Sequence, residues 1–136
     1  MEGYKEGIFK ISKDFERAKD LLVMAVERKE VIIKSIPKSV PYKLLEEYYE
    51  IAVQLITSIM YSEGYKTLGH IELIDFLRRF SELTEEDIRV LDNLRKFRHG
   101  TVYYGKKESG NYLINYEDKI NAIINKLLKL AKERIK

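Results

Sequence analysis

The sequence predicts an all-α fold, an up-and-down bundle of about five helices, four of them long and one short. Hydrophobic residues make up 45% of the 136 positions and charged residues 35%, enough to build a core under a polar surface. Only seven Gly and two Pro interrupt the chain, so long helices are favoured. Through most of the chain, apolar residues recur with the helical period of about 3.6.

The first two helices are separated by a short connector that contains both prolines. One helix is expected over residues 12–36, where the apolar positions share a face (Phe15, Ala18, Leu22, Ala25 and Val26). The next is expected over residues 41–62, with Pro41 in its first turn and Gly64 just after its end. It is apolar nearly all round from Ile51 to Ile59, which places it at the centre of the fold or against a partner chain. This run also suits a dimer seam.

Three more helices complete the predicted bundle. Gly69 and His70 open a short helix over residues 70–80, and Thr84 followed by three acids begins a helix that reaches about Tyr104. A last helix runs from Asn115 to the C-terminus. The aromatic and β-branched residues on both sides of KKESGN predict a small hairpin just before it. No repeat or linker divides the chain, so residues 1–136 are expected to form a single domain.

Composition excludes several classes of protein and site. The absence of Cys rules out a disulfide scaffold, a thiolate zinc site and cysteine catalysis. With only His70 and His99 as imidazoles, no metal site and no cofactor are expected. The longest uncharged stretch, residues 51–62, is shorter than the roughly 20 residues that a membrane span needs. No secretory signal is recognisable at the N-terminus, so a cytoplasmic protein without membrane contact is expected.

Basic residues concentrate in one segment. Residues 89–107 contain six basic residues and one acid, a net charge of +5, whereas the rest of the chain sums to −2. A polyanion such as RNA or a nucleotide would be attracted to this segment. The candidate binding residues are therefore its basic and aromatic side chains (Arg95, Lys96, Tyr104, Lys106 and Lys107). The alternative interpretation is a solvated helix face.

Within that segment, Arg95, His99 and Tyr103 are spaced to share one face of a helix. Arginine binds phosphate oxygens bidentately, and histidine titrates closest to neutral pH. Other polar residues receive simpler interpretations. The acids at 85–87 are typical of a helix start, His70 is interpreted as a helix-start residue, and the pair Tyr48–Tyr49 is interpreted as core or interface packing.

Over about residues 10 to 135 the chain resembles the HEPN domain of prokaryotes and archaea. The resemblance rests on the second helix (EYYEIAVQLITSIMYSEGYK), the Gly-His turn, and the end of the penultimate helix (LRKFRHGTVYYG). The family motif is Arg, a polar residue, three further residues, and His. It maps here to Arg98, His99, residues 100–102 and position 103, where this chain has Tyr instead of His.

Relatives with the intact motif are metal-independent ribonucleases, often toxins paired with an antitoxin of nucleotidyltransferase fold. Their dimers bring two Arg/His sets into one cleft. The resemblance implies Arg98, His99 and Tyr103 as catalytic positions, in a homodimer that binds RNA or nucleotide. Because the ordinary pKa of tyrosine is about 10, Tyr103 would be a poor base, and weak or absent nuclease activity is expected. Two alternatives stay open: an active ribonuclease in which His99 or Tyr103 takes the missing role, and a non-catalytic interaction bundle.

Overall fold

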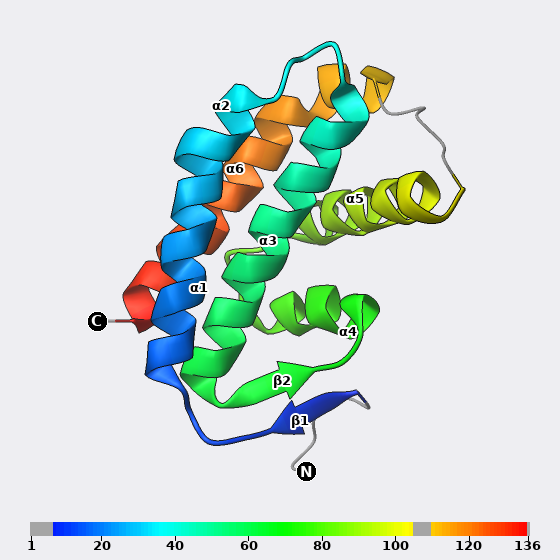
Figure 1. Ribbon diagram of the computed structural model, residues 1–136. Coiled ribbons are helices and arrows are strands. Elements are labelled where there is room, and N and C mark those ends of the chain that lie inside the picture. The colour runs from blue at the N-terminus through cyan, green and yellow to red at the C-terminus, as the bar shows by residue number, and fades with distance from the viewer. Residues whose placement is uncertain (1–6, 105–109, 136) are drawn as a thin grey trace.

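The computed structural model describes residues 7–104 and 110–135 and confirms the all-α bundle (Figure 1). In chain order its elements are β1 (Ile8–Lys10), α1 (Phe15–Glu27), the π-helical segment η1 (Arg28–Ile32), α2 (Ile33–Ser35), α3 (Pro41–Glu63), β2 (Tyr65–Thr67), α4 (His70–Asp75), the 3₁₀ segment η2 (Phe76–Arg79), α5 (Glu85–Tyr104) and α6 (Gly110–Arg134).

Helix α3 is the central element. It packs against α1, α5 and α6, and its apolar side chains are buried almost all round. Ile51, Leu55 and Ile59 are at most 1% exposed inside the core of this chain. The predicted central position is therefore confirmed. The predicted dimer seam at residues 51–59 is wrong, because the chain itself covers the side chains that a partner would need.

The boundaries of α3 follow from its end residues. Pro41 occupies the first turn, where its missing N–H costs no hydrogen bond. Gly64 ends the helix in the left-handed conformation with a φ of 87°. A Cβ at this position would lie 2.8 Å from the carbonyl oxygen of Ile11, so both the backbone angle and the close approach require glycine.

The first predicted helix is continuous but not uniform. Asp14 caps α1 by accepting a hydrogen bond from the backbone N–H of Arg17 at 2.9 Å. The chain then passes through the π turn of η1 into α2 without leaving the helical region. In η1, Nη1 of Arg28 lies 2.7 Å from Oε2 of Glu47, which ties this turn to α3.

A two-stranded antiparallel sheet positions the start of α4. Strand β1 pairs with β2 in the register Ile8↔Thr67, Phe9↔Lys66 and Lys10↔Tyr65. The hydroxyl of Thr67 donates to the carbonyl of Gly7 at 2.7 Å. Because His70 comes three residues after this anchored strand end, the sheet fixes where its side chain enters the fold.

The hairpin predicted before the last helix is wrong. Residues 101–104 belong to α5, and α6 already begins at Gly110, so the flanks of KKESGN are helical. Tyr112 and Tyr116, one helical turn apart, stack with ring centroids 4.4 Å apart, and Tyr112 also contacts Phe97 of α5 at 4.8 Å. Packing against α5 therefore overrides the strand preference of these aromatic residues.

Helices α1, α3 and α6 run side by side in Figure 1, whereas α5 lies across them and its C-terminal part extends away from the bundle. Helix α4 lies beside α5 and contacts it. This arrangement leaves the basic part of α5 at one side of the molecule. Within the described ranges, we find no helix whose length and apolar content would let it cross a membrane.

Candidate functional site

The basic side chains of α5 are held by ion pairs that are partly exposed to solvent. Nε of Arg95 lies 2.9 Å from Oδ1 of Asp92, one turn earlier on the same helix, and Nζ of Lys96 lies 3.4 Å from Oδ2 of Asp92. Nε of Arg98 lies 3.1 Å from Oε2 of Glu50, which belongs to α3. Three cations thus share two carboxylates, one from α5 and one from α3, and the five groups together carry a formal charge of +1.

These ion pairs remain open to solvent. The exposed fraction of the side chain is 23% for Arg95, 32% for Arg98 and 64% for Lys96. Ion pairs in contact with water contribute little to stability, typically about 0–1 kcal/mol. A phosphate could therefore replace Asp92 or Glu50 as the partner of an arginine at small cost to the fold.

Next to these arginines lies a tyrosine–histidine pair that the sequence interpretation missed. The hydroxyl of Tyr49 in α3 lies 2.7 Å from Nδ1 of His70, the first residue of α4. The two rings stack with centroids 5.6 Å apart and an interplanar angle of 28°. The sequence analysis singled out both Tyr48–Tyr49 and the Gly-His turn. Tyr49 and His70 are 21 positions apart, however, so their contact cannot be recognised until the fold is known.

The environment of Tyr49 and His70 keeps both side chains uncharged at neutral pH. Burial raises the pKa of Tyr49, so its hydroxyl keeps the proton at neutral pH. Partial burial of the ring and the positive charge of Arg98 lower the pKa of His70, and Glu50 opposes them. Both groups are therefore neutral at pH 7, and either the Tyr49 hydroxyl or Nδ1–H of His70 donates in their hydrogen bond, according to the tautomer of the imidazole.

The two groups of residues form one site. Glu50, the ion-pair partner of Arg98, directly follows Tyr49 in α3, and Tyr49 in turn contacts His70, so the arginines and the tyrosine–histidine pair are neighbours. Helices α3, α4 and α5 each supply part of this cluster. It combines two guanidinium groups, which bind phosphate oxygens, with an imidazole that can exchange a proton.

The structure describes only some of the predicted site residues. Arg95, Lys96, Arg98 and His99 lie on α5, and His99 is exposed. The backbone of residues 103 and 104 completes α5, but the side chains of Tyr103 and Tyr104 lie outside the described part of the chain. Lys106 and Lys107 also lie outside the described residues. Their predicted roles stay predictions.

The acids at the start of α5 have the structural role that the sequence predicted. The backbone N–H of Asp87 donates to Oγ1 of Thr84, and the backbone N–H of Thr84 donates to Oδ2 of Asp87, both at 3.0 Å. The buried carboxylate of Asp87 also lies 3.0 Å from Nζ of Lys119 and 2.7 Å from Nζ of Lys126, both in α6.

The hydrogen bonds of Asp87 determine its ionisation. Burial by itself raises the pKa of this carboxyl, but the hydrogen bonds from Lys126, the Thr84 backbone and Lys119 outweigh it. Together they lower the pKa to about 2. The ionised carboxylate of Asp87 therefore links α5 to α6 through its ion pairs with Lys119 and Lys126.

Within residues 7–104 and 110–135, no three His, Asp or Glu side chains are grouped as a metal ion would need. The chain was also compared with protein-family models, curated proteins and solved structures, and none of these comparisons gives a match.

Proposed function

We propose that this chain is an HEPN-like module that binds RNA or nucleotides by their phosphates, with Arg95 and Arg98 as the principal ligands. The observation that supports this most directly is the pair of partly exposed arginines, whose carboxylate partners a phosphate can replace. The surrounding segment has a net charge of +5 in a chain whose remainder is negative, which attracts a polyanion to this helix.

The proposed module has little or no nuclease activity and acts as a homodimer. Tyr103 stands where the related motif has histidine, and a tyrosine is a poor base at neutral pH. Since α3 is covered, a dimer contact would use other apolar side chains. Those exposed on the outer face of α1 and η1 are the candidates (Val23, Met24 and Val31). A nucleotidyltransferase-fold partner remains part of the proposal through the family resemblance alone.

A second candidate function is a metal-independent ribonuclease that uses His70. The observation in its favour is the hydrogen bond between Tyr49 and His70 beside Arg98. In such a reaction His70, with its own proton on Nδ1 donated to Tyr49, uses Nε2 to remove the proton of the RNA 2′-hydroxyl, and that oxygen then attacks the adjacent phosphorus. The bond to the 5′-oxygen breaks, that oxygen takes up a proton, and a 2′,3′-cyclic phosphate remains. Arg98 would stabilise the charge on the phosphorane.

Binding of labelled single-stranded RNA, measured by fluorescence anisotropy, tests the first proposal. Arg98→Ala is expected to weaken binding about tenfold or more, because a charge-assisted hydrogen bond to phosphate is lost. Arg17→Ala is the matched control, since Arg17 also faces a carboxylate, Asp14, but lies on α1. Equal affinity for the wild type and Arg98→Ala would contradict the proposal.

Incubation of RNA with the purified protein in excess chelator separates the two candidate functions. The binding module is expected to leave the RNA intact. A ribonuclease would release products ending in 2′,3′-cyclic phosphate, and both Arg98→Ala and His70→Ala would abolish that release. His99→Ala, in the same assay, shows whether the exposed histidine of α5 takes part instead.

A further inference from the structure

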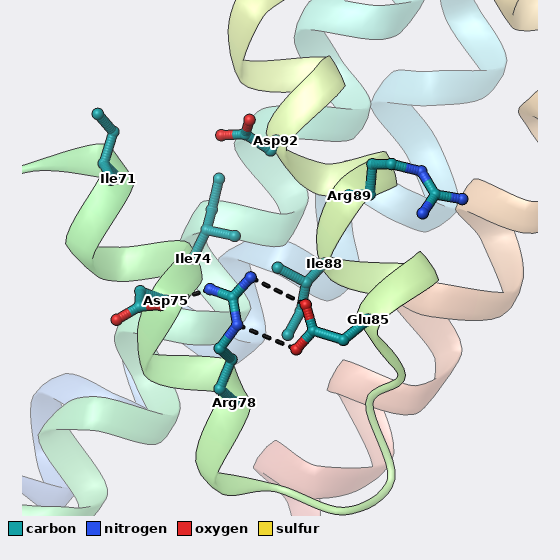
Figure 2. A pocket seen from close by; sticks show the side chains of 8 residues that line it. All are labelled: Ile71, Ile74, Asp75, Arg78, Glu85, Ile88, Arg89 and Asp92. Carbon is teal, nitrogen blue, oxygen red and sulfur yellow. Dashed lines mark hydrogen bonds and ion pairs between the residues drawn. The ribbon is translucent and has the colours of Figure 1, made fainter.

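A pocket of about 440 Å³ lies between α4–η2 on one side and α5 on the other (Figure 2). Its volume falls within the range of small-molecule sites, about 300–1,000 Å³. Three isoleucines form its apolar lining, Ile71 and Ile74 from α4 and Ile88 from α5. Ile74 and Ile88 are buried, whereas Ile71 is 59% exposed at the rim.

The two ends of this pocket differ. At one end Arg78 donates from Nε and Nη2 to the two carboxylate oxygens of Glu85, at 3.0 Å each, and so links η2 to α5. Arg78 also pairs with Asp75. At the other end, Ile71 and Asp92 lie on opposite sides of the pocket (Figure 2).

The second end adjoins the arginine cluster. Ile71 directly follows His70 in the chain, and Asp92 is the ion-pair partner of Arg95. A ligand whose phosphate lies at Arg95 and Arg98 can therefore extend into the pocket past these two residues.

The lining of the pocket carries both signs of charge. Three carboxylates and two guanidinium groups line it, and one of these carboxylates, Asp92, also belongs to the arginine cluster. Carboxylates outnumber guanidinium groups in the lining, which favours a ligand group that donates hydrogen bonds. A carboxylate offers about four lone-pair positions, so Asp92 can accept a hydrogen bond from a ligand in addition to those from Arg95 and Lys96.

We propose that this pocket is a nucleobase subsite that selects a base with an exocyclic amine. The inference rests on the proposed function, because it requires the phosphate at Arg95 and Arg98. Ile71, Ile74 and Ile88 contact the faces of the base, since apolar side chains can hold an unstacked base. Asp92 accepts a hydrogen bond from the amine, as carboxylates do from the N4 amine of cytosine.

Calorimetric titration with CMP, UMP and ribose 5-phosphate tests the subsite. CMP and UMP differ at ring position 4, where CMP has a donating amine and UMP an accepting carbonyl. CMP is expected to bind about tenfold more tightly than UMP, because only the amine donates to Asp92. Ribose 5-phosphate lacks a base and reports on the phosphate site alone.

Two variants place the selectivity in the pocket. Ile71→Trp fills the entrance and is expected to remove the advantage of CMP over UMP. Ile114→Trp, at a position 80% exposed on α6, is the matched control and keeps that advantage. Asp92→Asn is expected to lose the preference for CMP while ribose 5-phosphate binds more tightly, because Arg95 is released from its ion pair.

Equal affinity of the wild type for CMP and UMP, with ribose 5-phosphate still bound, overturns the subsite and leaves the phosphate site standing. An undiminished CMP preference in Ile71→Trp has the same meaning. If none of the three compounds binds, the phosphate site fails, and this subsite fails with it.

Discussion

The two halves of α5 both contain ion pairs, but those of the first half centre on a buried carboxylate and those of the second half are partly exposed to solvent. In the first turn, the fully buried carboxylate of Asp87 is held by Thr84 and by two lysines of α6. In the second half, Arg95 and Arg98 face Asp92 and Glu50 in ion pairs that are a quarter to a third exposed.

Burial explains the difference between the two halves. A buried carboxylate that loses its partners cannot be hydrated without opening the structure, so its contacts are part of the fold. A partly exposed arginine that loses its partner is hydrated without opening the structure, so the partner can be exchanged for a ligand. We infer that the first half of α5 holds the bundle together and that the second half is available for binding.

The largest expected effect is on stability, from Asp87→Ala. This change removes the cap of α5 and both lysine contacts, and it should lower the free energy of unfolding by about 3 kcal/mol. Urea denaturation of the wild type and the variant measures the difference. Glu86→Ala is the control, because Glu86 is an exposed neighbour that also lies near Lys119. Equal losses in the two variants would contradict the special role of the buried carboxylate.

A somewhat smaller effect is expected from acid. Because the folded-state pKa of Asp87, about 2, lies below its ordinary value of 3.8, the stabilisation is complete above about pH 4. It is lost as the pH falls through the folded-state pKa and amounts to about 2 kcal/mol. The measurement is the free energy of unfolding at about pH 5 and at about pH 2. Asp87→Asn should lack this pH-dependent loss of stability. Identical pH profiles for the wild type and Asp87→Asn would contradict its assignment to Asp87.

The smallest effect on stability is expected from Glu50→Gln, which should at the same time strengthen phosphate binding. The change removes the partner of Arg98 and should alter the free energy of unfolding by less than about 1 kcal/mol. Affinity for ribose 5-phosphate should rise about threefold, because Arg98 no longer has to leave a carboxylate. Denaturation and calorimetry on the same preparation measure both. A loss of several kcal/mol would show that the second half of α5 is structural too.

The sequence was sufficient to predict most of the fold, because its helix signals are local. Pro41 and Gly64 bound α3, and Thr84 with the following acids begins α5, as expected from capping. The failed hairpin shows the limit of such signals. Tyr112 prefers a strand by composition, but its ring packs against Phe97, a contact between two helices that local preference does not encode.

The candidate site was only partly predictable, for a similar reason. Arg95 and Arg98 are close in sequence and share a helix, so their cluster could be expected from charge and spacing. The pair of Tyr49 with His70 depends on how β1 and β2 place the start of α4 against α3. Nothing in the spacing of those residues along the chain indicates it.

The measurement that tests the central claim most directly is the salt dependence of RNA binding by the wild type, Arg98→Ala and Arg17→Ala. Each phosphate contact on a single strand adds about 0.7 to the slope of log affinity against log salt concentration. Arg98→Ala is expected to reduce the slope by about that amount while its free energy of unfolding stays near that of the wild type. Arg17→Ala should keep the full slope. An unchanged slope in Arg98→Ala would contradict the assignment of the second half of α5 to phosphate binding.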